Sequence, residues 1–146
     1  MLDRIWHLRG SIPLSVNSSD AVVFDRLAKA LSKQQKSIAS RDHSSLDFDG
    51  PLITFGGNWH TLVIYDRGRF EIERGPNHAV LRYDLRSLHA FFFCLGAGAL
   101  FAGIALPEGW AAGLRMGLLA IGWLYGMNLI LAVLRVPGWL QRAIAP

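Results

Sequence analysis

Two long apolar runs near the end of the chain restrict its possible folds more than any other feature. Residues 88–106 contain only His89 and the weakly acidic Cys94 as ionisable groups, and residues 116–134 contain no charge. As a helix, either run covers roughly 28 Å, enough to span a hydrocarbon core. We therefore predict an antiparallel two-helix transmembrane hairpin over residues 87–135. The alternative is a buried hairpin of a soluble domain, but such helices normally carry a polar stripe, and these have none.

The remaining length and charge predict one small domain over residues 1–86. This segment is nearly neutral, with a small surplus of Lys and Arg over Asp and Glu, so we expect no nucleic-acid partner. The single cysteine, Cys94, lies within the first apolar run, which excludes a disulfide framework and a cysteine-based zinc site. The N-terminus does not have the pattern of a signal peptide, so we expect the domain to stay in the cytoplasm.

Arginines beside the apolar runs predict the orientation of the hairpin. Arg82 and Arg86 precede the first run, Arg135 and Arg142 follow the second, and only Arg115 lies near the connection. Because positive residues favour the cytoplasmic side, both termini are predicted there, as in a two-pass protein of the bacterial inner membrane. Residues 136–146, which contain Trp139 and Arg142, are predicted to form an interfacial cytoplasmic tail.

Residues 1–86 carry the patterns of an α+β domain. Residues 5–14 alternate apolar and polar side chains, which predicts a half-buried strand, and Pro13 predicts that this strand lies at an edge. Polar residues at 17–20 supply N-cap chemistry for one main helix that ends near Lys33. Shorter strands are predicted at residues 37–39, 46–48 and 52–55.

Two predicted turns give the other strands a register. With turns at Arg67-Gly68 and at residues 75–78, the apolar side chains share one face of the sheet and the charged ones share the other. We therefore predict an antiparallel meander whose last strand continues through Leu85 into the first membrane helix. The opposed pairs would be Tyr65/Phe70, Val63/Ile72, Phe70/Tyr83, Ile72/Leu81, Glu71/Arg82 and Arg69/Asp84.

The stretches LRGSIPL, YDRGRFEIE and VLRYDLRSLHAFFFC, together with the hairpin, resemble small bacterial inner-membrane proteins of uncharacterised function. These have a cytoplasmic α+β domain before a two-helix transmembrane hairpin. The resemblance covers most of the chain but contains no functional motif. It implies a bacterial membrane location and no particular activity.

Two groups of polar residues are candidate sites in the domain. Asp42, His43, Asp47 and Asp49 offer oxygen ligands and one imidazole, suited to a divalent ion or to acid-base chemistry, although the same residue types are usual in a solvated turn. Four cations share one face of the main helix if it continues far enough. They form either a solvated face or a contact for anionic headgroups or an acidic partner. These are Arg26, Lys29, Lys33 and Lys36.

Small residues in the hairpin predict close contacts between helices. Two GxxxG pairs, Gly113/Gly117 and Gly122/Gly126, point about 180° apart on an ideal helix, so one can serve the hairpin while the other is left for a partner. Asn128 is predicted deep in the membrane, level with Cys94, where its amide bonds within the chain or with a second protein. The predicted interface residues are Gly96, Gly98, Gly103, Gly113, Gly117, Gly122, Gly126 and Asn128.

No motif in the sequence names a reaction, so no catalytic residue or cofactor is predicted. The leading hypothesis is a non-catalytic membrane accessory or assembly subunit that contacts membrane lipids and binds another integral membrane protein or itself. One alternative is a small membrane-anchored enzyme that acts at the cytoplasmic face through the Asp42/His43/Asp47/Asp49 loop. A second alternative is a homo-oligomeric pore.

Overall fold

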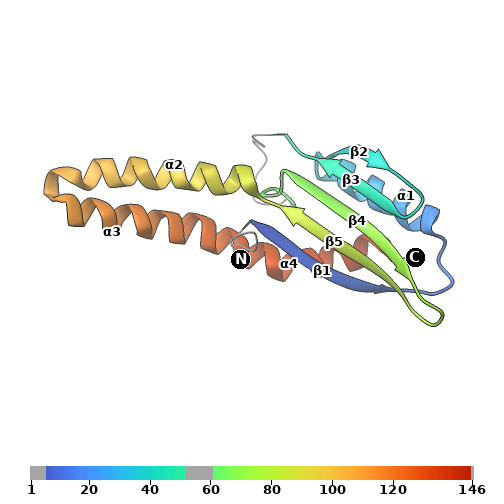
Figure 1. Cartoon of the computed structure of the whole chain (residues 1–146). Helices are drawn as coiled ribbons and strands as arrows, with labels where there is room; N and C mark the ends of the chain where they lie inside the picture. Colours follow the sequence, from blue (N-terminus) through green and yellow to red (C-terminus); the bar gives the residue numbers. More distant parts are fainter. Residues whose placement is uncertain (1–5, 52–60, 146) are drawn as a thin grey trace.

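The structure is a computed structural model that describes residues 6–51 and 61–145. Figure 1 shows an elongated molecule, with a helical hairpin at one end and a sheet covered by helices at the other. The elements are β1 (His7–Leu14), α1 (Asp20–Lys33), β2 (Ser37–Arg41), β3 (Ser45–Asp49), β4 (Arg67–Arg74), β5 (Ala79–Arg86), α2 (Leu88–Ala105), η2 (Leu106–Glu108), α3 (Trp110–Ile121), the π-helical η3 (Gly122–Gly126) and α4 (Met127–Ile144).

The strands within the described residues form one five-stranded antiparallel sheet in the order β1-β5-β4-β3-β2. The strands β2 to β5 form a meander, but one strand differs from the prediction. Residues 61–64 form a turn, and β3 pairs with β4 in place of the expected strand, so the pairs Tyr65/Phe70 and Val63/Ile72 were wrong and Leu46 opposes Phe70. The strand β1 pairs with β5 at an edge of the sheet, as Pro13 predicted. The α+β class is therefore confirmed. The predicted strand at residues 52–55 lies outside the described residues.

The register between β4 and β5 agrees with the prediction, but the turn at Arg67-Gly68 was wrong. Phe70 opposes Tyr83 and Ile72 opposes Leu81, as expected. Arg67 and Gly68, however, belong to β4 and pair with both β5 and β3. Gly68 is needed for space, because a Cβ there would collide with the rings and methyl groups of Phe48 and Leu85. Gly68 therefore permits close contact between strands and does not form a turn.

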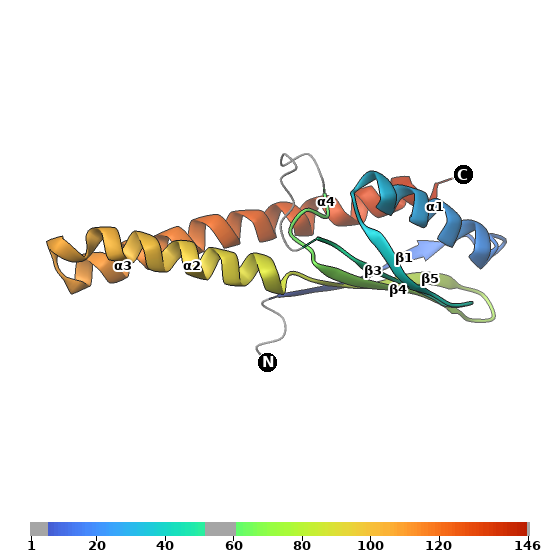
Figure 2. The ribbon, with the colours of Figure 1, turned by 90° about the horizontal axis from the view of Figure 1, so that it is seen from above.

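One face of the sheet is covered by helices and forms the core of the domain (Figure 2). In α1, Val23, Phe24, Leu27 and Leu31 are buried on a single face, as its apolar spacing predicted. Alternate residues of the strands point toward this helix, including Leu46, Phe70 and Leu81, and Leu62 and Tyr65 join the same core. The opposite face of the sheet carries the charged residues.

The C-terminal segment differs from the predicted interfacial tail. The helix that begins at Trp110 continues to Ile144, and the part beyond residue 131 enters the domain, where Ala132, Val136 and Leu140 join the core beside α1. The end of the second apolar run, at Ala132, therefore packs against the domain. Every fourth residue from 132 to 140 is apolar, a period that places all three on the face toward the sheet.

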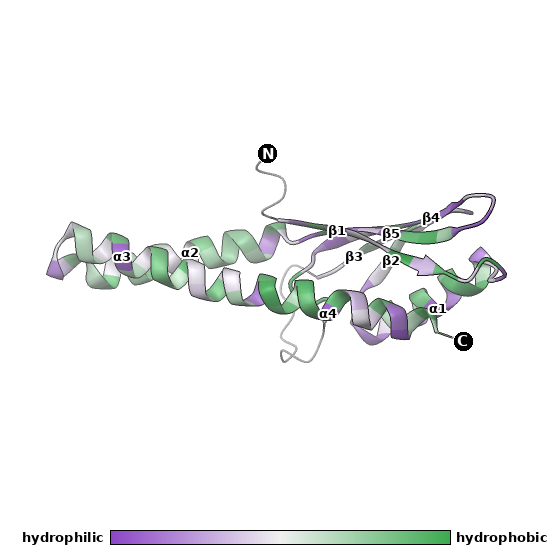
Figure 3. Ribbon diagram, turned by 90° about the horizontal axis from the view of Figure 1, so that it is seen from below, coloured by the Kyte–Doolittle hydropathy of each residue, from purple (hydrophilic) through white to green (hydrophobic). Residues whose placement is uncertain are grey.

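The hairpin consists of two helices that are long and apolar enough to cross a membrane. They extend over Leu88–Glu108 and Trp110–Ile144, and only 17% of the most apolar window of either helix is buried within the molecule. Figure 3 shows that hydrophobic residues continue through α3 into the start of α4. The connection turns at Gly109, whose φ of 120° is a conformation that favours glycine.

Candidate functional site

Three glycines bring the two hairpin helices into backbone contact. A Cβ added to Gly117 would lie 2.9 Å from the carbonyl oxygen of Gly98, and one added to Gly113 would lie 2.9 Å from that of Ala102. Gly98 is in turn covered by Ile121. The Gly113/Gly117 pair therefore lies in the intrachain contact of the hairpin.

The second pair, Gly122 and Gly126, lies on an open surface. No atom comes within 4 Å of a Cβ built at either position, and the same is true of Gly96 and Gly103 on α2. A shallow apolar groove of about 500 Å³ runs over Gly122 and Gly126. The side chain of Trp123 is prominent beside it, with 69% of the residue exposed. The groove is lined by Leu118, Leu119, Gly122, Trp123, Gly126, Met127 and Ile130.

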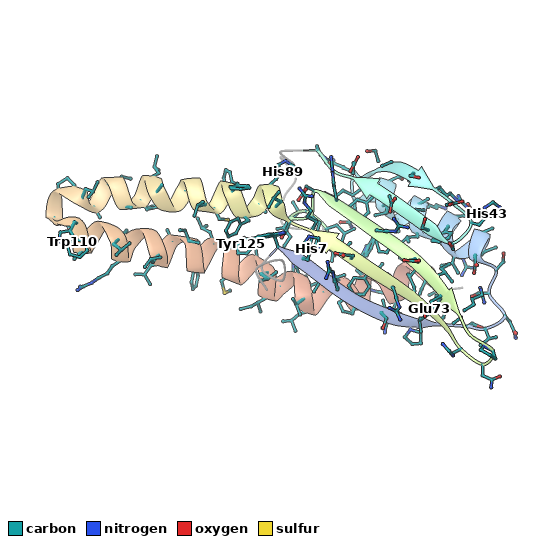
Figure 4. All side chains as sticks on the ribbon, viewed as in Figure 1. His7, His43, Glu73, His89, Trp110 and Tyr125 are labelled. Carbon is teal, nitrogen blue, oxygen red and sulfur yellow. The ribbon has the colours of Figure 1, made fainter. Side chains whose placement is uncertain are left out.

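The backbone beneath this groove is a single π-helical turn, Gly122–Gly126. Its wider turn holds one more residue than an α-helical turn, which rotates the side chains that follow relative to those before. Tyr125 points inward from this turn, where its hydroxyl lies 3.0 Å from that of Ser87 and its ring meets Phe91 edge to face. Tyr125 therefore joins η3 to the start of α2, and Figure 4 labels it where the hairpin meets the domain.

Asn128 lies elsewhere than predicted. Gly98 faces Gly117 and Ala102 faces Gly113, so the same register places Cys94 opposite Ile121, seven residues before Asn128. Asn128 is therefore at the junction with the domain, because the chain turns at residues 106–109 and not near residue 111. Its Nδ2 donates to the carbonyl oxygen of Leu124 at 2.6 Å, so the amide is bonded within its own helix.

The four cations predicted to share one face of the main helix divide into structural and exposed residues. Arg26 donates to the carbonyl oxygens of Ile144 and Ala145, at 3.1 and 2.8 Å, and so caps the C-terminus of α4. Lys36 is buried, and its Nζ donates to the carbonyl oxygen of Tyr65 at 2.6 Å. Of the four cations, only Lys29 and Lys33 are exposed on α1. The four residues therefore do not form a single surface.

The acidic loop residues are similarly separated. Asp42 and His43 are exposed in the β2–β3 turn, where the His43 backbone N–H and ring hold the pKa of Asp42 below its usual value. Asp47 and Asp49 lie on the charged face of β3, near Arg69 and Arg67 respectively. Among the described residues, no three His, Cys, Asp or Glu side chains are grouped as a metal site.

A buried carboxylate, that of Asp66, was not among the predicted site residues. Asp66 precedes β4 with its side chain only 3% exposed, and neither of its oxygens has a hydrogen-bond partner among the described residues. His89 Nδ1 lies 3.2 Å and Arg86 Nε 3.8 Å from it, so the first turn of α2 and the end of β5 both lie close to this carboxylate. Asp66 also opposes the effect of burial on the pKa of Lys36. The sequence offers no motif that joins these four residues.

A second cluster lies on the open face of the sheet, on the adjacent strands β1 and β5. Asp84 accepts from Arg9 Nε at 2.7 Å and lies 2.6 Å from His7 Nδ1. Burial raises the pKa of Asp84, but the bonds from His7 and Arg9 outweigh it and leave a net lowering. The predicted alternation of residues 5–14 places His7 and Arg9 on one face. Together with the pairing of β1 and β5, this alternation locates both residues beside Asp84.

Comparison of the chain with protein-family models, with curated proteins and with solved structures gives no match.

Proposed function

We propose that this protein is a two-pass membrane subunit without catalytic activity, which binds another integral membrane protein or a second copy of itself. The observation that carries the proposal is the contrast between the two glycine pairs. Gly113 and Gly117 contact the partner helix of the hairpin, whereas Gly122 and Gly126 face outward beneath an apolar groove. Small residues of this kind allow a further helix to approach closely in a bilayer.

The length and exposure of the hairpin support a location in the membrane. From Leu88 to Ala105 the helix α2 covers roughly 27 Å. Large apolar side chains are exposed along it, including Phe93, Leu100 and Ile104. We assign the protein to the bacterial inner membrane with both termini in the cytoplasm, since Arg86 and Arg135 lie at the domain end of the hairpin.

A matched pair of glycine substitutions tests the association. Gly122→Val adds side chain to the open groove, so we expect it to abolish cross-linking to a partner or second copy while the hairpin and domain remain folded. Gly117→Val places the same side chain against the backbone of Gly98, and we expect it to separate the hairpin helices. In-membrane cross-linking followed by mass spectrometry, with circular dichroism as the folding check, distinguishes the two effects.

Equal cross-linking of the unmodified protein and the Gly122→Val variant would contradict the proposal. A further control is Gly96→Val, which changes an open position on the other helix without altering this groove. Orientation is measured separately with a phosphatase fused after Pro146. Alkaline phosphatase activity there would place the C-terminus outside the cytoplasm and refute the assigned topology.

A further inference from the structure

Most arginines of the domain pair with a carboxylate, including Arg41 with Asp25 and Arg74 with Asp20 beside α1, whereas a second group of cations has no such pair. On the open face of the sheet, each arginine of one group lies within 4 Å of a carboxylate: Arg9, Arg67, Arg69, Arg82 and Arg86. On the helical side, Lys29, Lys33, Arg135 and Arg142 have no ion pair within the part of the chain that the structure describes. The cations without an ion pair among the described residues therefore lie on α1 and α4.

Two of these unpaired cations flank a groove between α1 and α4. The groove has a volume of about 400 Å³, and no carboxylate lines it among the described residues. Lys33 enters from α1 and Arg142 from α4, and the half-buried indole of Trp139 forms part of the wall. The other lining residues are Ala30, Gln34, Thr61 and Ala143.

The side chain of Arg142 is held by its own helix. Its Nε donates to the carbonyl oxygen of Gly138 at 3.0 Å, while its two terminal nitrogens have no bond among the described residues. Those nitrogens form the fork that binds carboxylates in a bidentate manner. The neighbouring indole supplies a flat apolar surface for one uncharged side chain.

We propose that this groove, formed by Lys33, Trp139 and Arg142, binds an acidic segment of a protein partner. Carboxylates of the segment would pair with Lys33 and Arg142, and an apolar residue between them would lie on Trp139. Lys29, one helical turn before Lys33, extends the same positive field along α1.

The distance of the groove from the membrane favours a protein segment over lipid headgroups as its ligand. This choice of ligand depends on the proposed membrane location, whereas the positive charge of the groove does not. If α4 leaves the hydrocarbon near Asn128, Arg142 lies about 21 Å further along its axis. The headgroup layer extends roughly 5–8 Å beyond the hydrocarbon, and charges are screened over about 8 Å at physiological salt. Arg135 is within reach of headgroups, but the groove is beyond them.

The binding test uses the full chain, as single copies in nanodiscs of neutral phosphatidylcholine. The probe is a short fluorescein-labelled peptide of alternating Glu and Leu, and fluorescence anisotropy reports its affinity. Lys33→Glu and Arg142→Glu should each weaken binding by roughly 5–10-fold, as expected for reversing one exposed ion pair. Arg115→Glu makes the same charge change at the far end of the hairpin and should leave the affinity unchanged. A Lys-Leu peptide should not bind.

Three results would overturn the inference. The first is no binding of the acidic peptide, and the second is an equal loss of binding with Arg115→Glu. The third is loss of peptide binding when the nanodisc contains phosphatidylglycerol, because lipid headgroups would then occupy the groove. Gly122→Val should bind the peptide normally, so failure of the proposed helix association would not be mistaken for failure of the groove.

Discussion

The buried lysine of the domain gives a prediction about pH that can be worked out from the structure. Lys36 is only 5% exposed, and its burial lowers its pKa from 10.5 to about 8, although the Asp66 carboxylate acts in the opposite direction. A Cβ at Gly50 would also collide with the Lys36 side chain, so this site is tightly enclosed. We expect the protein to become more stable between pH 7 and pH 9.5.

The sign follows from the proton that Lys36 releases. Above pH 8 the folded chain has lost this proton, while the unfolded chain keeps it up to its ordinary pKa of 10.5. Because the unfolded state binds more protons over this interval, the free energy of unfolding rises with pH. Integration between pH 7 and pH 9.5 gives up to about 2 kcal/mol, or roughly 5 °C or more in Tm.

The upper limit of the interval is set by two tyrosines. Burial raises the pKa of Tyr65 and that of Tyr83 above the ordinary value of 10.0. An acid whose folded-state pKa is raised loses its contribution to stability as the pH rises through its unfolded-state value. Measurements should therefore stop at pH 9.5, before these residues reverse the trend.

Thermal unfolding in a non-ionic detergent, followed by near-ultraviolet circular dichroism, measures this dependence. Lys36→Met keeps the length of the side chain and removes the charge, so its Tm should be nearly flat over the interval. Lys33→Met makes the same chemical change at an exposed position and should retain the rise of the unmodified protein. If Lys36→Met rises as steeply as the unmodified protein, another group causes the effect and the reasoning is refuted.

Three further predictions concern the core, the sheet and the membrane interface. Leu140→Ala should cost about 2–5 kcal/mol in domain stability because Leu140 is fully buried, whereas Leu134→Ala, at a residue 72% exposed, should cost little. Thermal unfolding compares the two, and equal effects would mean that the C-terminal segment is not part of the core. Gly68→Ala should lower Tm through collision with Phe48, and adding Phe48→Leu should recover part of the loss. Asn128→Leu should leave cross-linked complexes intact, since its amide bonds Leu124; their loss would place Asn128 in the interface.

The sequence predicted the features that depend on local periodicity. The alternation in β1, the single apolar face of α1 and the pairing of β4 with β5 are each determined by neighbouring residues and one short turn. The role of Gly68 could not be predicted in the same way. Its need for space comes from Phe48, and no local pattern shows that a ring from another strand will cross that position.

For the candidate sites, helical geometry alone predicted that the two glycine pairs face different directions. The environment of each cation could not be predicted in this way. Arg26 and Lys36 occupy the same helical stripe as Lys29 and Lys33 on an ideal wheel. Arg26 is removed from that surface by its bond to Ala145. Lys36 is removed because α1 ends at Lys33, and its Nζ instead donates to Tyr65. The same is true of Asp66, whose neighbours come from β5, from α2 and from the loop between α1 and β2.

The helix from Trp110 to Ile144 makes the hairpin and the domain mechanically dependent on each other. Its first half provides the Gly122 groove, and its second half provides both core residues and the wall of the basic groove. Val136 and Leu140 are fully buried, so this half cannot rotate without opening the core. Pro137 removes one backbone donor within the helix and is the position at which bending costs least. A partner helix at Gly122 would therefore also fix the direction in which Trp139 and Arg142 face.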